Sequence, residues 1–346
     1  MDPVSLVSVI VPCRNEERFI QECLDSIVAT QYPHDSLEVL VVDGQSDDRT
    51  RAIVEGYVAR HPFIKMLDNP GRVPSKAVNI GIRAARGDIL VRLDAHTLYP
   101  ESYIPSLVSA LRETGASNVG GVLDTIPAEQ TPIARAIATA MSHPFGVGNA
   151  LFRIGAAEVR PVETLAFFCC RRETFEKVGL FDEEAPDEDS DFNARLIQAG
   201  GKVMLVPSIV CRYFARSSVN EVIRLFYRYG LSKPSLAWKH RRLQTWRQLV
   251  PPAFVLSSLI TAVLSPLFDT AALLFATTTL LYLSAVTAVS LYAGRKARGR
   301  GIAALALVFP AVHVSYGIGV LTGTLKLIRQ RLLPTGRKFA TKAASP

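Results

Sequence analysis

The chain has 346 residues, enough for one large domain and an appendage, and 49% of them are hydrophobic. Its formal net charge is +8, but the excess cations gather beside long apolar runs, which argues against nucleic-acid binding. The five cysteines are odd in number and lack metal-ligand spacing, which predicts reduced structural thiols rather than a zinc site or a disulfide framework.

The first hundred residues alternate between apolar, strand-like runs and helical patterns. Strands are predicted at residues 7–11, 37–42, 63–67 and 89–93, with helices at 16–29, 47–59 and 75–86 between them. This alternation predicts an α/β domain built on a parallel, doubly wound sheet. Such sheets bind ligands at the carboxyl edge of their strands, where this chain places Arg14, Asp43 and Asp94 on successive loops.

The run GDILVRLDAHTLYP, residues 87–100, is the most informative segment. Its apolar strand ends on Asp94, and His96 follows two residues later. The two side chains could share a divalent cation that in turn holds a diphosphate, or Asp94 could simply cap a turn. Neither GxGxxG after the first strand nor GxxxxGK[ST] is present, which argues against a dinucleotide site or a P-loop. A nucleotide diphosphate held by a metal remains open.

A second informative block runs from residue 163 to 207. It predicts a strand at 167–170, helices at 172–178 and 188–199, and a closing strand at 202–206. Carboxylates at a helix start ordinarily interact with the helix dipole, and Asp191 can pair with Arg195 four residues later. We therefore expect structural roles for Asp187 and Asp191. Glu188 and Asp189 are adjacent and point in different directions, so one of them could face the sheet edge as a base.

Beyond residue 248 the chain becomes almost wholly apolar. Residues 249–268, 270–293 and 302–325 are each long enough to cross a bilayer, the alternative being buried helices of a soluble bundle. Basic residues flank these runs, and such flanks mark the cytoplasmic face and attract anionic lipid. They are Lys239, His240, Arg241, Arg242 and Arg247 before the first run, Arg295, Lys296, Arg298 and Arg300 before the last, and Lys326, Arg329, Arg331, Arg337, Lys338 and Lys342 after it.

Three full crossings conflict with these flanks, because they would separate the basic loop from the basic tail at 327–346. We therefore favour a re-entrant or interfacial last run, which Pro310, His313 and several glycines interrupt. Residues 216–248 are amphipathic and predict helices in the membrane interface. There Arg224 and Arg228 share a helix face and could grip a phosphate together or be merely solvated. The N-terminus lacks the basic region and cleavage site of a signal peptide, which favours a cytoplasmic domain at 1–215.

Four motifs in this order resemble the family 2 glycosyltransferases. They are VSVIVPCRNEE, VLVVDGQSDDRT, the DAH strand end, and GLFDEE followed by DEDSDFNARLIQAGG. The resemblance covers roughly residues 5–230 and is greatest for bacterial exopolysaccharide enzymes of the succinoglycan type, which carry C-terminal membrane helices. It implies the glycosyltransferase-A fold, a Rossmann-like nucleotide-diphospho-sugar transferase domain, together with a nucleotide-sugar donor, inversion of the anomeric centre and use of Mg²⁺ or Mn²⁺.

The resemblance also implies roles for single residues at the donor site. Pro12, Arg14 and Glu16 would line the nucleoside pocket, and Asp43 would hydrogen-bond to the base, usually uracil. The basic side chains of Arg72 and Lys76 would contact the nucleotide.

Metal, base and acceptor roles follow from the same resemblance. Asp94 and His96 occupy the ends of the family's DxD metal motif, and a histidine in place of the final acid suits Mn²⁺ better than Mg²⁺. The metal would then be held by Asp94 and the diphosphate, with His96 as an optional ligand. Asp189 matches the catalytic base. Glu188 beside it, and more loosely Arg224 and Arg228, would face the acceptor and its phosphate.

The expected function is a membrane-bound, inverting, single-addition transferase at the cytoplasmic face of a bacterial inner membrane. It would move a sugar from a UDP-sugar to a hydroxyl of a polyprenyl-diphosphate-linked saccharide, in exopolysaccharide or cell-envelope glycan synthesis. One alternative is a polyprenyl-phosphate glycosyltransferase, whose anionic acceptor needs no base, so the Glu188-Asp189 pair counts against it. The other is a membrane-anchored nucleotide-binding module without catalysis, against which the presence of Asp94 and Asp189 argues.

Overall fold

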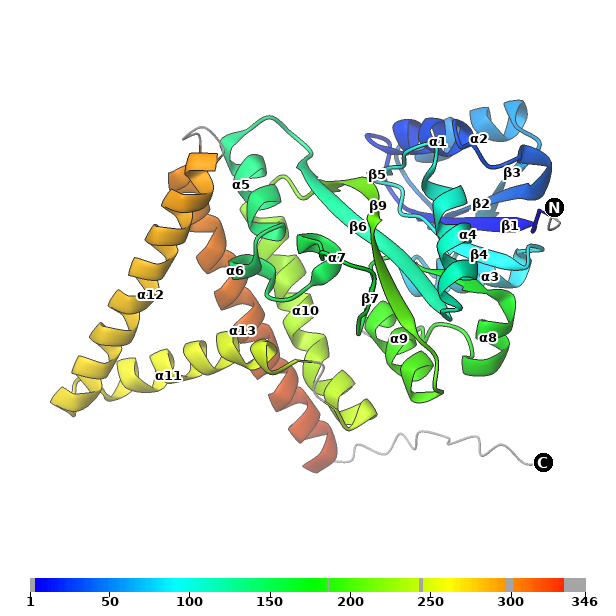
Figure 1. Cartoon of the computed structure of the whole chain (residues 1–346). Helices are drawn as coiled ribbons and strands as arrows, with labels where there is room; N and C mark the ends of the chain where they lie inside the picture. The colour runs from blue at the N-terminus through cyan, green and yellow to red at the C-terminus, as the bar shows by residue number, and fades with distance from the viewer. Residues whose placement is uncertain (1–3, 186, 243–244, 297–300, 333–346) are drawn as a thin grey trace.

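A mixed β-sheet forms the centre of the amino-terminal two-thirds of the chain (Figure 1). The structure is a computed structural model that describes residues 4–185, 187–242, 245–296 and 301–332. Within this part the strands lie in the order β3-β2-β1-β4-β8-β6-β9-β5, with β7 beside β9. The strands are β1 (Val7–Cys13), β2 (Leu37–Asp43), β3 (Ile64–Asp68), β4 (Ile89–Arg92), β5 (Thr97–Leu98), β6 (Asn118–Pro127), β7 (Arg160–Pro161), β8 (Cys169–Arg171) and β9 (Val203–Ala215).

Helices cover both faces of the sheet because its strands bury side chains on both sides. Val9 and Val11 of β1 belong to one apolar core and Ile10 between them to the other, as the alternation of side chains along a strand requires. The first core includes α1 (Ile20–Val28), α2 (Thr50–Arg60) and α4 (Tyr103–Thr114), and the second includes α3 (Pro74–Ala84), α8 (Arg172–Val178) and α9 (Glu188–Gln198).

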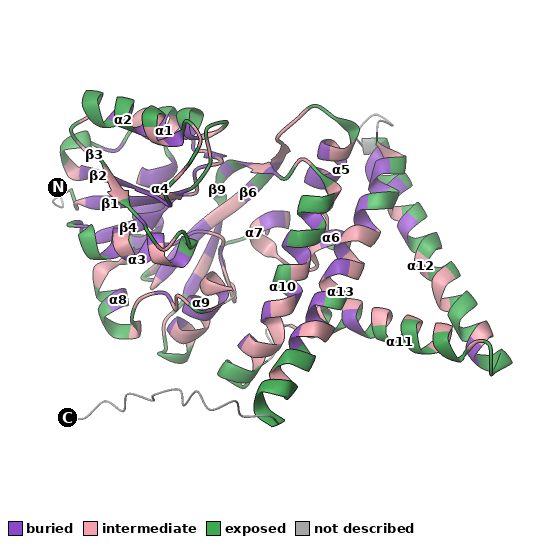
Figure 2. Cartoon of the chain, turned by 180° about the vertical axis from the view of Figure 1, so that it is seen from behind, coloured by how far each residue is buried: buried purple, intermediate pink, exposed green. Residues whose placement is uncertain are grey.

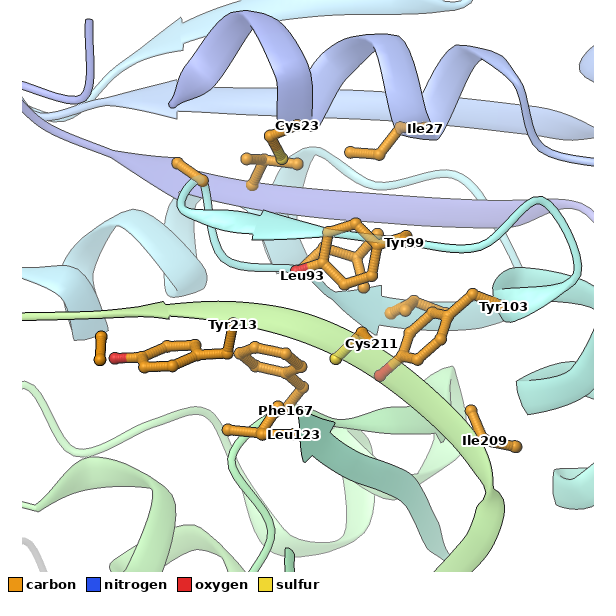
Figure 3. Packing of buried hydrophobic residues seen from close by; sticks show 14 of the residues in the cluster. Cys23, Ile27, Leu93, Tyr99, Tyr103, Leu123, Phe167, Ile209, Cys211 and Tyr213 are labelled. Atoms are coloured by element: carbon orange, nitrogen blue, oxygen red, sulfur yellow. The ribbon is translucent and has the colours of Figure 1, made fainter. Parts of the chain in front are cut away.

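Part of the first core is formed by side chains that lie far apart in the sequence. Figure 3 shows Cys23 and Ile27 of α1 on one side and Cys211 and Tyr213 of β9 on the other, with Tyr99 between them. All five cysteines are buried and free, which confirms the prediction of reduced thiols.

The sheet is not wholly parallel, so that part of the prediction was wrong. β1 pairs in parallel with β2 and β4, and β2 with β3, as expected. β8, however, is antiparallel to both β4 and β6, and β5 and β7 are antiparallel to β9. Antiparallel neighbours need no crossover helix, and these short strands gave no alternating βαβ pattern in the sequence. β6 was not predicted at all, and the strand expected at 202–206 continues to Ala215.

Four long helices follow the sheet: α10 (Val219–His240), α11 (Val250–Leu264), α12 (Asp269–Lys296) and α13 (Ile302–Leu332). In the described part of the chain, three helices are long and apolar enough to span a membrane: Trp246–Leu264, Asp269–Arg295 and Ile302–Leu332. Both views show α11 and α12 reaching away from the sheet, and α13 returning beside α10 (Figures 1 and 2). Of the predicted basic flanks, Arg298, Arg300, Arg337, Lys338 and Lys342 lie outside the described residues.

The last apolar run is one continuous helix of 31 residues, so the expectation that this run is re-entrant was wrong. Pro310 lies inside α13 without ending it. Within the most apolar stretch of α13, 44% of the residues are buried in the protein, against 6% in the corresponding stretch of each of the other two candidate spans. Figure 2 shows this difference, since α13 carries buried residues where α11 and α12 are mostly exposed. α13 is therefore an internal helix as well as an apolar one.

Glycines allow α10 and α13 to touch backbone to backbone. A Cβ atom added at Gly230 of α10 would lie 2.2 Å from the carbonyl oxygen of Tyr316, and one at Gly319 of α13 would lie 2.3 Å from that of Tyr227. Small residues at helix crossings permit this approach. The amphipathic helix predicted within 216–248 is α10, and part of its apolar surface packs on the sheet domain and α13.

Candidate active site

The carboxyl ends of β2, β1 and β4 lie side by side, which confirms that the loops after these strands meet at one edge. Cys13 at the end of β1 pairs in register with Asp43 at the end of β2, and Ile10 pairs with Arg92, the last residue of β4. Arg14, Asp43 and Asp94 therefore lie on neighbouring loops along this edge.

Arg92 is the centre of the site and was not among the residues predicted from the sequence. Its side chain is only 7% exposed. Nε donates to Oδ1 of Asp94 at 3.2 Å, and Nη1 donates to Oδ1 of Asp189 at 2.6 Å and lies 4.0 Å from Oε1 of Glu188. One guanidinium thus joins the end of β4 to the first turn of α9, across 97 positions of sequence. The sequence did contain a signal that could have identified Arg92. It is a charged residue inside an apolar strand, and it lies two positions before Asp94, which places both side chains on the same face.

Burial and the neighbouring charges act on the pKa of Asp189 in opposite directions. Burial raises its pKa well above the ordinary value, the charge of Arg92 opposes this, and the charges of Glu188 and Asp94 add to it. A raised pKa makes the ionised carboxylate a stronger base, and the charge of Arg92 acts to keep Asp189 ionised. Glu188 and Asp189 were expected to point in different directions, but both carboxylates approach Nη1 of Arg92, at 4.0 and 2.6 Å.

His96 is held by Glu16, which brings the loops after β1 and β4 together. Nδ1 of His96 lies 3.1 Å from Oε1 of Glu16. Burial lowers the pKa of His96, but Tyr213 and Glu16 outweigh that effect and raise it to about 9. Glu16 thus interacts with His96 in this structure, and its predicted contact with a nucleoside stays a prediction.

Asp94 and His96 would hold a divalent cation only together with ligands from the substrate, and His96 would first have to lose the proton on Nε2. Among the described residues no group of three or more His, Cys, Asp and Glu side chains could hold a metal by itself. Asp94 uses Oδ1 with Arg92, and His96 uses Nδ1 with Glu16, so Oδ2 and Nε2 have no hydrogen-bond partner in the described part of the chain. A carboxylate on the second ring nitrogen is the usual support of a metal-binding histidine. Two protein ligands are enough where phosphate oxygens complete the shell.

Asp43 is enclosed rather than open at the edge. Its side chain is 0% exposed, and its oxygens accept from the hydroxyl and backbone N–H of Ser46, at 2.5 and 3.1 Å, and from Nη1 of Arg51 at 2.8 Å. Arg51 also pairs with Asp68 at 2.7 Å. Asp43 therefore shapes the loop after β2, and its predicted contact with a base would require these partners to move.

Three non-glycine residues in the loops after β1, β2 and β3 have left-handed backbones: Asn15 (φ 56°), Gln45 (φ 56°) and Arg72 (φ 55°). Such conformations are sparsely populated and gather at functional sites. Nε of Arg72 donates to Oε1 of Gln45 at 2.9 Å, which links two of these loops. Lys76 is half-buried in the first turn of α3.

Arg14 is exposed and its stem covers Gly44, since a Cβ there would lie 3.1 Å from Cβ of Arg14. Pro12, at the end of β1, is half-buried. The structure thus brings Pro12 and Arg14 to the same edge as Arg72 and Lys76, while their nucleotide contacts stay predictions.

The remaining acids of α9 are structural, as expected. Asp187 caps the helix by accepting from the backbone N–H of Ser190 and forms an ion pair with Lys233 of α10 at 2.6 Å. Asp191 pairs with Arg195 at 3.0 Å, the predicted contact four residues apart. It also binds Lys239 and His240 of α10, at 2.8 and 2.9 Å. α10 is thereby fixed to α9, next to Asp189.

Arg224 and Arg228 are exposed, four residues apart on α10. In the described part of the chain, neither forms an ion pair. The structure thus leaves them on the surface of α10, and neither forms an ion pair with Asp94, Glu188 or Asp189, the carboxylates around Arg92.

Comparison with known proteins agrees with this geometry. Residues 8–179 match the model of the family described as glycosyl transferase family 2. The succinoglycan biosynthesis protein ExoA of Rhizobium meliloti is 30% identical over 248 residues, which cover 71% of this chain and 74% of that relative. A Methanococcus voltae protein named dolichyl N-acetyl-alpha-D-glucosaminyl phosphate 3-beta-D-2,3-diacetamido-2,3-dideoxy-beta-D-glucuronosyltransferase is 28% identical over 81% of this chain and 91% of its own length.

Among solved structures, the mannosyltransferase PcManGT from Pyrobaculum calidifontis, in complex with GDP-Man and Mn²⁺, shares the fold. Its TM-score is 0.62 at 22% identity, over 93% of this chain and 87% of that one. The resemblance to the glycosyltransferase-A fold and to succinoglycan-type enzymes is thereby confirmed, and the chain is a member of glycosyl transferase family 2.

Proposed function

We propose that this chain transfers a sugar, with inversion, from a UDP-sugar to a hydroxyl of a polyprenyl-diphosphate-linked saccharide in exopolysaccharide or cell-envelope glycan synthesis. The observation that carries the proposal is Arg92, which ties Asp94 at the donor edge to the candidate base Asp189. The names of the relatives support the acceptor class, since one belongs to succinoglycan biosynthesis and the other names a sugar on a dolichyl phosphate.

In this mechanism the acceptor hydroxyl oxygen attacks the anomeric carbon of the donor sugar. The bond from that carbon to the diphosphate breaks, its electron pair leaves with the diphosphate, and the hydroxyl proton passes to Asp189. Arg92 is a positioning residue, because it fixes one oxygen of Asp189 and leaves the other to accept the proton. Proton transfer of this kind contributes a factor of about 10²–10⁴ to the rate.

Asp94, with His96 as an optional ligand, would hold Mn²⁺ or Mg²⁺, which neutralises charge that develops on the leaving diphosphate. The Mn²⁺ and GDP-Man bound to the structural neighbour support this assignment. The basic side chains along the same edge, Arg14, Arg72 and Lys76, add positive charge for the diphosphate.

The rival acceptor is a polyprenyl phosphate. Its oxygen is already an anion, so transfer to it needs no base and would gain nothing from Asp189. The pairing of the buried Arg92 with the partly exposed Glu188 and Asp189 therefore favours a hydroxyl acceptor.

The test is UDP release from a panel of UDP-sugars by the detergent-purified chain, with Mn²⁺, Mg²⁺ or EDTA, and with or without a polyprenyl-diphosphate-linked sugar. We expect release that needs metal and acceptor and that falls about 10²–10⁴-fold in Asp189→Asn. Asp182→Asn is the matched control, since Asp182 is also a carboxylate paired with a cation, Lys239 at 2.7 Å. Release that survives Asp189→Asn and needs only polyprenyl phosphate would favour the rival, and no release with any donor would favour a nucleotide-binding module.

We further propose that the sheet domain lies on the cytoplasmic face of a bacterial inner membrane, with α11 and α12 entering the bilayer. α13 would then lie along the interface between this hairpin and the sheet domain, since it packs on α10, α5 (Pro132–Met141) and α6 (Pro144–Val147). In this arrangement both basic flanks of α13 lie on one side, which removes the conflict that three full crossings would create.

A further inference from the structure

A short segment after β6 connects the apolar helices to the sheet edge. It comprises α5, α6 and α7 (Leu151–Ile154), and Figure 1 shows α6 and α7 between α13 and β6. Nε2 of His313 in α13 lies 2.6 Å from the carbonyl oxygen of Phe145, whose ring packs edge-on against Phe309 at 5.1 Å. α7 packs against β6 on its other side. Any residue that points from α7 toward the sheet thus lies between the membrane helices and the site.

Arg153 of α7 is such a residue, and its charge is not balanced within the described part of the chain. It is 9% exposed, and its Nη1 is buried without a hydrogen-bond partner. No described carboxylate forms an ion pair with it. Instead its guanidinium carbon lies 5.2 Å from the ring centroid of Tyr213 and 5.3 Å from that of Phe152. A buried cation without a counter-ion is costly, and a ligand that supplies the missing anion relieves that cost.

Tyr213 relates Arg153 to the candidate active site. The ring of Tyr213 on β9 contacts the ring of His96 edge-on at 5.1 Å, so Arg153 and His96 both contact this one aromatic ring.

We propose that Arg153 binds a phosphate of the lipid carrier that delivers the acceptor sugar. This proposal rests on the proposed function, because it assumes an acceptor anchored by a phosphorylated lipid. A carrier phosphate at Arg153 would lie between the membrane helices and Asp189, so that the attached sugar reaches the base. The donor diphosphate has its own cations on the loops after β1 and β3, Arg14 and Arg72.

The buried Arg153 is a stronger candidate for this contact than the pair predicted from the sequence. Arg224 and Arg228 are exposed, and water weakens the attraction between an exposed cation and a phosphate. A guanidinium stacked on two rings is already oriented, and its planar fork matches two phosphate oxygens.

The test measures ligand binding and needs no sugar transfer. Farnesyl diphosphate, farnesol and UDP are titrated separately into the detergent-purified full chain by calorimetry. For Arg153→Met we expect farnesyl diphosphate to bind about 10- to 100-fold more weakly, the usual value of a hydrogen bond to a charged group, with UDP binding within twofold of wild type. Farnesol, which lacks the phosphates, should bind wild type and variant alike. Arg60→Met is the matched control, because Arg60 also lies over a tyrosine ring, Tyr57 at 4.6 Å, but is exposed on α2.

Arg153→Lys keeps the positive charge and covers the case in which the methionine variant does not fold. A lysine lacks the fork, so farnesyl diphosphate should bind it several-fold more weakly, again with UDP unchanged. Weaker UDP binding in either variant would assign Arg153 to the donor and overturn the proposal, as would unchanged farnesyl diphosphate binding in a folded variant. If no sugar transfer is found but this binding still depends on Arg153, the proposed function fails while the phosphate site stands.

Discussion

Replacing Arg92 with methionine would remove the cation that Asp94, Glu188 and Asp189 share. The side chain is 7% exposed and lies 3.2 Å from Asp94 and 2.6 Å from Asp189, so the change leaves a group of carboxylates without their buried partner. Removing one partner of a buried ion pair costs about 3–5 kcal/mol of unfolding free energy. For a domain of this size that corresponds to a fall in melting temperature of about 6–20 °C.

The same change should act on the chemistry through Asp189. The charge of Arg92 opposes the rise in the pKa of Asp189, so its loss raises that pKa further. Since the base must be ionised to accept a proton, the acid limb of the pH profile of kcat/KM should move to higher pH. At neutral pH we expect kcat/KM to fall by up to about 10²–10⁴-fold, the usual contribution of a general base.

Glu188→Gln provides the opposite perturbation at the same place. The charge of Glu188 raises the pKa of Asp189, so its removal should shift the acid limb to lower pH. The assay is UDP release against pH for wild type, Arg92→Met, Arg92→Lys and Glu188→Gln, with melting temperatures measured alongside. Arg92→Lys should fall between wild type and Arg92→Met. Shifts of the two opposing variants in one direction, or no shift in either, would refute the reasoning.

Three further predictions concern the framework around the site. Asp191→Asn should lower stability at pH 7, because the fully buried Asp191 carboxylate binds Arg195, Lys239 and His240, which hold its pKa below the usual value despite burial. Wild type should lose this advantage only as the pH falls below about 4, through the lowered pKa of the folded state, and thermal melts of both proteins against pH would show it. Gly230→Ala should cost about 1–3 kcal/mol or more, since the new Cβ would meet a backbone oxygen at 2.2 Å. Gly56→Ala, with nothing within 4 Å of the new atom, should be neutral or stabilise by about 0.5–1 kcal/mol in the same denaturation assay. Finally, Arg295→Cys near the end of α12 and Leu332→Cys at the last residue of α13 should both react with an impermeant maleimide from the cytoplasmic side only. Labelling from opposite sides would show that α13 spans the membrane.

The sequence by itself determined the features that depend on local period and hydropathy. The strands at residues 7–11, 37–42 and 89–93 follow from short apolar runs, and the structure has them within two residues of those bounds. The loops that carry Arg14, Asp43 and Asp94 follow from the rule that parallel strands end at one edge. The Asp191–Arg195 pair was predictable because helix geometry brings residues four apart together.

Only the tertiary structure decided which charges are buried and what balances them. The sequence did not show that Ser46 and Arg51 enclose Asp43, whose contact with a base stays a prediction. Arg92 was not predicted, although it joins Asp94 to Asp189. The apolar run of α13 read like the runs of α11 and α12, but α10 and the segment that carries Arg153 cover it. A local pattern reports the period and polarity of a segment. The partner of a side chain comes from residues far away in the chain, and whether that partner exists sets the energy of a buried charge.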